Sequence, residues 1–354
     1  MIESTNKAQG GDQAGQPGPA AKSRFSSILE FRSGIHLIGT GLWLDATAVK
    51  EISFVSHAHK DHFARHKSII ATEQTIRLCR ERLDINEALT VPYRQPFSLG
   101  ELTLELYPAG HMLGSAQVLI KLPESKGGIR IGYTGDFNTE CSMTAEKAEQ
   151  MKCDVLVIES TFGNPTYVMP PKEKVLDDIA AFSQRCFSET ATPVIFAYSV
   201  GKAQEVIKQL EARGLDTRVH KTIWEFCKVY EEFGVGFTRL HKLVDESRRG
   251  EVVILPSIPG GAGRGKVFSQ LRSPKTAVVT GWAIDQGTKY SYGVDEAFPL
   301  SDHADFNRLI AYVEGSGAKK IFVTHGQVDD FVKILRDRGF DAEPIIPPAQ
   351  LSLF

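Results

Sequence analysis

The sequence has no paired cysteines, no long apolar run and little net charge. Its cysteines are scattered and form no Cys-x-x-Cys pair; they are Cys79, Cys141, Cys153, Cys186 and Cys227. This spacing argues against a cysteine-based metal site and favours a reducing compartment, so we expect a cytoplasmic protein. No apolar stretch has the length of a membrane-spanning helix, and the first residues show no signal-peptide pattern, so we expect no membrane partner.

The net charge of −2 and the pI near 6.6 do not indicate a nucleic-acid binder. A local patch can still attract phosphate, because that attraction depends on nearby charge. The most basic stretch contains Arg239, Lys242, Arg248, Arg249, Arg264, Lys266, Arg272 and Lys275. Two interpretations stay open for it: a phosphate-binding patch, or a solvated face with a mobile glycine-rich loop at Gly260–Gly265.

The 354 residues suffice for one large or two medium domains. Residues 1–24 are rich in Gly, Gln, Ala, Ser and Pro, which predicts a disordered tail. From Phe25 onward, short apolar stretches alternate with helical patterns, as in an α/β protein. The clearest helices are expected at Gly201–Arg213, capped by Ser199, and at Asp329–Arg338.

Ionisable residues repeatedly follow short apolar stretches that we expect to be strands. Residues 52–56 precede His57, residues 129–134 precede Gly135-Asp136, residues 154–158 precede Glu159, and residues 321–324 precede His325. In α/β sheets, ligands and catalytic groups gather at the edge where strands end. The pattern therefore predicts a functional site at one sheet edge.

The strongest local signal is His57-Ala58-His59-Lys60-Asp61-His62. His57 and His59 are two residues apart on an extended chain, so they face the same side and can bind one ion. Asp61 and His62 follow on the turn and can face a second ion. One histidine here would suggest only a surface loop, but four ligating side chains at this spacing favour a metal site. Imidazole and carboxylate together suit zinc.

That spacing resembles the signature of the metallo-β-lactamase family, and further segments follow in the family's order. Leu42–Asp45 resembles its first motif, Pro108–His111 supplies the next histidine, and Tyr133–Asp136 supplies a bridging aspartate. The resemblance implies two Zn²⁺ ions. It places His57, His59 and His111 on one ion, Asp61 and His62 on the other, Asp136 between them, and Asp45 in support. Histidine and aspartate ligands also permit Mn²⁺.

The second half resembles the β-CASP branch of that family, whose members are nucleases. Val157–Gly163, Phe298–Asp305 and Phe322–Gly326 are similar to its motifs A, B and C, and Tyr198–Glu205 is similar to a recurrent segment of its inserted domain. The resemblance implies that His325 completes the second zinc site. It also implies that His303, paired with Glu159, protonates the leaving oxygen. The expected catalytic residues are therefore Asp45, Asp61, Glu159 and His303.

The implied fold is α/β: a metallo-β-lactamase αββα sandwich with an inserted β-CASP α/β domain. We expect a tail at residues 1–24, the first part of the sandwich at 25–165, the inserted domain at 166–290, a return segment at 291–345 and a second tail at 346–354. The implied activity is a two-zinc hydrolysis of phosphodiester bonds.

The expected substrate rests on two further resemblances. His325 at motif C is typical of RNA-processing members, whereas the chain length and motifs B and C are most similar to bacterial ligase-associated DNA exonucleases. The final residues, Gln350-Leu351-Ser352-Leu353-Phe354, follow two prolines and resemble the pentapeptide that docks on the β sliding clamp. Alternatively, these apolar side chains pack back on the domain.

A clamp suits DNA repair, so we predict a DNA exonuclease that acts with a DNA ligase and the clamp. The first alternative is an RNA-processing nuclease of the same branch. The second alternative is a lactonase or thioesterase, which needs neither the inserted domain nor motifs A to C.

Overall fold

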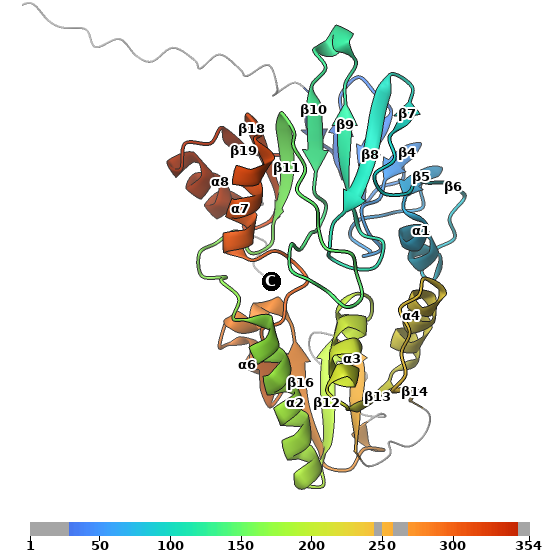
Figure 1. Ribbon diagram of the computed structural model, residues 1–354, viewed down its shortest axis with the longest axis vertical. Helices are drawn as coiled ribbons and strands as arrows, with labels where there is room; N and C mark the ends of the chain where they lie inside the picture. The colour runs from blue at the N-terminus through green and yellow to red at the C-terminus, as the bar shows by residue number, and fades with distance from the viewer. Residues whose placement is uncertain (1–27, 244–249, 258–267, 346–354) are drawn as a thin grey trace, which may run out of the picture.

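The computed structural model describes residues 28–243, 250–257 and 268–345 (Figure 1). Both expected tails lie outside the described residues, and with them the pentapeptide Gln350–Phe354. The same is true of Gly260–Gly265 and of Arg248, Arg249, Arg264 and Lys266 in the basic stretch. No helix within the described ranges is long and apolar enough to cross a membrane.

The first sheet has the strand order β1-β2-β3-β4-β5-β6. Its strands are β1 (Leu29–Phe31), β2 (Ile35–Leu37), β3 (Leu42–Leu44), β4 (Ile52–Phe54), β5 (Ser68–Ala71) and β6 (Glu87–Thr90). The first three run antiparallel to one another, and β3 to β6 run parallel.

The second sheet has the order β19-β18-β11-β10-β9-β8-β7. Its strands are β7 (Phe97–Leu99), β8 (Leu102–Pro108), β9 (Ala116–Lys121), β10 (Arg130–Tyr133), β11 (Val155–Ser160), β18 (Lys320–Gly326) and β19 (Ala342–Pro344), and a short 3-10 helix, η1 (Glu124–Lys126), lies between β9 and β10. Strands β10, β11, β18 and β19 are parallel neighbours, so their carboxyl ends lie at one edge.

These two sheets share one apolar core, to which Leu44 and Phe54 contribute from the first and Val118 and Ile131 from the second. Helices α7 (Phe306–Ser316) and α8 (Val328–Asp337) cover the outer face of the second sheet (Figure 1). Helix α1 (Glu73–Arg80) packs outside the first sheet. The layers form the predicted αββα sandwich. Strand β11 is buried at all of its positions, as expected for a parallel strand covered on both faces.

The third sheet forms the lower body in Figure 1 and consists of parallel strands in the order β14-β13-β15-β12-β16-β17. Its strands are β12 (Thr192–Ala197), β13 (Asp216–Val219), β14 (Leu240–Lys242), β15 (Glu251–Pro256), β16 (Pro274–Val279) and β17 (Glu296–Phe298). Helices α2 (Lys172–Ser188), α3 (Lys202–Ala212) and α4 (Lys221–Glu232) pack on it. The 3-10 helix η3 (Gly281–Ile284) and helix α6 (Thr288–Tyr292) precede β17.

Both predicted helices are present, but the predicted cap is wrong. The apolar residues that share one face of α3 are all buried: Ala203, Val206, Ile207 and Leu210. Ser199 does not cap this helix, because Gly201 lies between it and the first turn with a φ of 89°. The backbone N–H of Gly201 instead donates to Gln204 Oε1 at 2.8 Å. Helix α8 matches the predicted 329–338 to within one residue at each end.

The predicted strand ends need small corrections. Strand β4 ends at Phe54, before His57, whereas Glu159 lies inside β11 and His325 inside β18. Parallel pairing continues through Glu159 opposite Thr324, which keeps both strands hydrogen-bonded beyond their apolar stretches. The side chains of Glu159 and His325 nevertheless lie at the carboxyl ends of the neighbouring strands β11 and β18, at the sheet edge that the sequence pattern predicts.

Candidate metal centre and cleft

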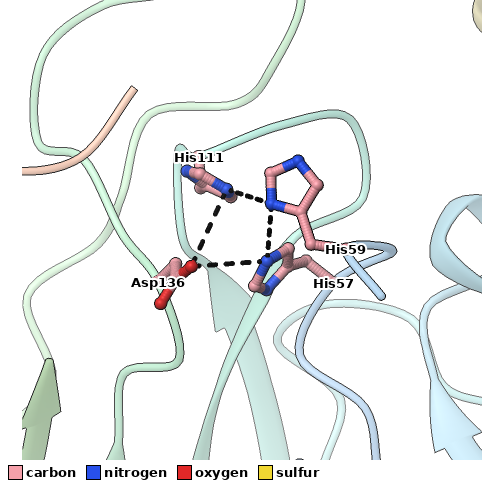
Figure 2. A group of neighbouring side chains, drawn as sticks. All are labelled: His57, His59, His111 and Asp136. Carbon is pink, nitrogen blue, oxygen red and sulfur yellow. Dashed lines mark hydrogen bonds and ion pairs between the residues drawn. The ribbon is translucent and has the colours of Figure 1, made fainter. Parts of the chain in front are cut away.

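Four predicted ligands converge in the loops that follow β4, β8 and β10 (Figure 2). One ligand atom from each of His57, His59, His111 and Asp136 lies within 4.8 Å of the others. Nδ1 of His59 is 3.1 Å from Nε2 of His57 and 3.1 Å from Nε2 of His111. Oδ2 of Asp136 is 3.4 Å from Nε2 of His57.

Hydrogen bonds on the far side of each ring fix which nitrogen faces the cluster. Nε2 of His59 donates to the carbonyl of Val200 at 3.2 Å, and Nδ1 of His111 donates to the carbonyl of Asp302 at 2.9 Å. Nδ1 of His57 lies 2.9 Å from Ser56 Oγ. The facing nitrogens therefore carry lone pairs, which repel one another unless a cation lies between them. Three imidazole nitrogens and one carboxylate oxygen fit a divalent metal ion.

A second, looser set lies on the other side of Asp136. Nε2 of His62 is 3.3 Å from Asp136 Oδ2 and 3.8 Å from Asp61 Oδ2. The ring of His325 stacks on that of His62, with centroids 5.1 Å apart. Asp136 thus lies between two groups of candidate ligands. The side chain of Asp61 is 79% exposed, so it reaches this set from the open side.

One buried carboxylate supports both sets. Asp45, which follows β3 with a φ of 45°, accepts the backbone N–H of Ser56 at 2.7 Å and its hydroxyl at 2.5 Å. The carboxylate also accepts the hydroxyl of Tyr133 at 2.7 Å and Nδ1 of His62 at 2.9 Å. These bonds hold Nε2 of His62 toward Asp136. The sequence predicts the support by Asp45, but assigns no role to Ser56 or Tyr133.

Burial lowers the pKa of His57, His111 and His325 and lowers the pKa of His59 to about 3. These imidazoles are therefore neutral at neutral pH, which is the state that a metal ligand requires. Burial alone would raise the pKa of Asp136, but the neighbouring His62 holds it well below its ordinary value. The carboxylate is consequently ionised.

Glu159 and His303 form a separate pair beside this centre. Nδ1 of His303 lies 3.0 Å from Oε1 and 3.1 Å from Oε2 of Glu159. The carboxylate also accepts the backbone N–H of Phe137 at 2.9 Å and of Thr161 at 3.2 Å, which fixes its position. Burial would lower the pKa of His303, but Glu159 raises it to about 9. His303 is therefore protonated at neutral pH.

Two residues that the sequence leaves without a role connect the third sheet to this centre. Nζ of Lys202, at the start of α3, lies 2.8 Å from Oδ1 of Asp302 and donates to the carbonyl of Leu300 at 2.7 Å. Burial would raise the pKa of Asp302, but Lys202 holds it below its ordinary value. The pair positions the carbonyl of Asp302, which accepts Nδ1 of His111. Backbone acceptors of this kind carry no sequence signature.

A cleft of about 490 Å³ opens over these residues between the two bodies of Figure 1. The sandwich contributes Asp61, His62 and His325 to its lining, and the third-sheet body contributes Tyr198, Lys202 and Trp282. Among the described residues of the basic stretch, Ser257 is the only one that lines the cleft. Arg239 is paired instead with Asp216 at 3.1 Å.

Sequence relatives identify the family. A protein named "Probable DNA ligase" from Opitutus terrae is 38% identical over 328 residues, which are 92% of this chain and 32% of that protein. An "RNase J-like protein" from Methanocaldococcus jannaschii is 24% identical over 84% of this chain and 88% of its own length. The "DNA cross-link repair 1A protein" of Mus musculus is 27% identical over 46% of this chain and 17% of its own length.

The chain belongs to the β-CASP branch of the metallo-β-lactamase family. No family model matches it. This β-CASP protein spans about a third of the length of the Opitutus terrae relative. Its fold is similar to that of a solved protein of unknown function from Enterococcus faecalis V583, with a TM-score of 0.54 at 11% identity over 84% of this chain and 79% of that one.

Proposed function

We propose that this β-CASP protein is a two-zinc nuclease that hydrolyses phosphodiester bonds in DNA. The arrangement that carries the proposal is a pair of ligand sets sharing Asp136, with the Glu159–His303 pair beside them. Two bound divalent ions would activate water near neutral pH and neutralise charge on a phosphodiester. The neutral, pre-oriented histidines His57, His59 and His111 suit that role.

His303 supplies the acid in this proposal. Glu159 engages its Nδ1, which leaves Nε2 as the nitrogen that can deliver a proton to a leaving oxygen. A pKa of about 9 keeps the ring protonated at neutral pH, so the proton is available when the bond breaks. Asp45 and the Lys202–Asp302 pair act through the histidines that they position.

One relative favours DNA as the substrate. The protein named "Probable DNA ligase" matches at 38% identity over 92% of this chain, whereas the "RNase J-like protein" matches at 24% over 84%. The shorter matches to a "DNA cross-link repair 1A protein" at 27% and to an "Endoribonuclease YSH1" at 30% do not separate DNA from RNA. RNA is the second candidate, and the observation that favours it is His325 beside His62.

The proposal extends to partners and domain organisation. A DNA ligase and the β sliding clamp are the proposed partners, the clamp through Gln350–Phe354. The inserted domain is proposed at residues 166–290 and the return segment at 291–345. The third sheet, built from residues 192–298, supports an inserted domain but moves its end, because β17 (Glu296–Phe298) still pairs with β16 of that sheet. A cytoplasmic location is supported by the five free cysteines.

The deciding experiment is a cleavage assay with purified, metal-analysed protein. Matched single-stranded DNA, duplex DNA and RNA would carry a label at either end, and a lactone and a thioester would serve as small-molecule alternatives. We expect progressive degradation of DNA from one end. Preferential cutting of RNA would replace DNA with the second candidate, and hydrolysis of the lactone or thioester alone would overturn the nuclease function.

A further inference from the structure

Arg82 lines the same cleft as the candidate metal centre, two residues beyond the end of α1. In the part of the chain that the structure describes, no carboxylate oxygen lies within 4.0 Å of its guanidinium. Arg77, on the last turn of the same helix, contrasts with it, because Glu232 binds it at 2.8 Å and Glu81 binds it at 2.6 Å. Arg82 thus brings to the cleft a positive charge that forms no ion pair with an acidic side chain of the described residues, although the charge of Asp61 acts on it from further away.

The guanidinium of Arg82 is half-buried and held in place. Its central carbon lies 4.9 Å from the ring centroid of Phe226 on α4, so the planar group rests on an aromatic ring of the opposite body. Such stacking fixes the direction of the N–H fork and reduces the entropy lost when it binds a partner. Burial lowers the pKa of Arg82, yet arginine stays charged at neutral pH.

The surrounding helices place Arg82 toward one end of the cleft. Arg82 follows α1 and contacts α4, and these two helices lie on the same side of Figure 1. His303 shortly precedes α7, which lies on the other side of that view, so Arg82 lies away from the proposed acid. Exposed Lys60 lines the cleft next to Asp61 and forms no ion pair with the described residues.

We propose that Arg82 binds a backbone phosphate of the nucleic-acid strand, next to the bond that is cut rather than at it, with Lys60 adding a second positive charge. An oriented guanidinium without an ion pair among the described residues matches the paired oxygens of a phosphodiester. This inference rests on the proposed nuclease function and adds to it the side of the metal centre along which the strand runs. The competing role is a purely structural contact between α1 and α4.

The test compares two substrates in Arg82→Gln, Arg82→Lys and the control Arg80→Gln. One substrate is a single-stranded oligodeoxynucleotide, and the other is bis(p-nitrophenyl) phosphate, which has one phosphodiester and no neighbouring phosphate. In Arg82→Gln we expect the ratio of kcat/KM for the oligonucleotide to that for the small diester to fall about tenfold, mainly through KM. The slope of log KM against log salt should shrink by about 0.7, the value for one phosphate contact on a single strand.

Arg82→Lys should restore the slope of log KM against log salt, because lysine keeps the positive charge. It should restore only part of the kcat/KM ratio, because lysine lacks the paired N–H donors of the guanidinium. Arg80→Gln removes the same charge from an exposed position outside the cleft and should leave ratio and slope at the parent values. A structural role predicts a lower melting temperature in Arg82→Gln with an unchanged ratio, and that result would overturn the inference alone. A parent protein that cleaves the small diester but no oligonucleotide would overturn the nuclease function together with it.

Discussion

Nδ1 of His303 is within 3.1 Å of both carboxylate oxygens of Glu159, although the two residues are 144 positions apart in the chain. This contact joins motif A on β11 to motif B before α7, so that a carboxylate from one motif holds a protonated imidazole from the other. Neither Glu159 alone nor His303 alone would indicate a catalytic role. The pairing makes the proposed acid specific enough to test.

Replacing His303 with Ala should lower kcat on DNA about 10²- to 10⁴-fold, the usual contribution of a general acid. The metal content should stay at the parent level, because the predicted ligands are untouched. Steady-state kinetics and elemental analysis on the same preparation check both. His241→Ala, an exposed histidine on β14, is the matched control. Parent-like turnover in His303→Ala would contradict the assignment of the acid.

Asp61→Ala should both abolish turnover and lower the bound metal, since Asp61 is a predicted ligand and reaches the site from its open side. The protein should lose activity in a chelator and regain it when Zn²⁺ or Mn²⁺ is returned. Metal content measured after gel filtration separates this variant from His303→Ala. Asp84→Ala, on an exposed ion pair with Arg65, serves as the control. Full metal occupancy in Asp61→Ala would remove it from the ligand set.

Asp45→Asn should weaken metal binding about 10- to 100-fold, because the carboxylate holds His62 and Ser56 in place. Asparagine tolerates the left-handed backbone of this position, so strain should not contribute. Competition with a chromophoric chelator measures the affinity. Tyr133→Phe removes one of the hydrogen bonds to Asp45 and should have a smaller effect. Unchanged affinity in Asp45→Asn would show that the ligands need no such support.

Glu205→Gln should destabilise the protein by about 2 kcal/mol at pH 7, because charged Glu205 accepts Lys172 Nζ and Ser142 Oγ, each at 2.7 Å. Burial alone would raise the pKa of Glu205, but Lys172 lowers it below 4.5. Its stabilising contribution is therefore complete above pH 4.5 and is lost as the pH falls through the folded pKa. Urea unfolding at several pH values should show the variant and parent converging in acid. Glu173→Gln, at an exposed ion pair with Arg213, should change little at any pH.

Removing Gln350–Phe354 should abolish binding to the β sliding clamp and leave cleavage of short DNA unchanged. Calorimetry with purified clamp measures the first, and the oligonucleotide assay measures the second. A chain whose Leu353 and Phe354 are replaced by Ala keeps the length and should behave like the deletion. Equal clamp affinity with and without these residues would eliminate the motif.

The α/β class and the group His57, His59, Asp61 and His62 are predicted from local patterns, namely short apolar strands and the His-x-His-x-Asp-His spacing. The sandwich, His111 and Asp136 are predicted only through the family resemblance. The prediction that Ser199 caps α3 is wrong, and the reason is also local, because Gly201 adopts a positive φ between Ser199 and the first turn of the helix. No local pattern could reveal the hydrogen-bond acceptors of His59 and His111, which are the backbone carbonyls of Val200 and Asp302. Every residue has a carbonyl, so only the assembled fold shows which ones serve the site.

Those two carbonyls also set an order of events during protein synthesis. Val200 follows His59 by 141 residues, and Asp302 follows His111 by 191. A ribosome therefore releases the histidines long before it releases the groups that orient them. The candidate centre cannot be complete until Asp302 has been translated and both bodies have folded, so a polypeptide that stops before this residue does not carry a finished centre.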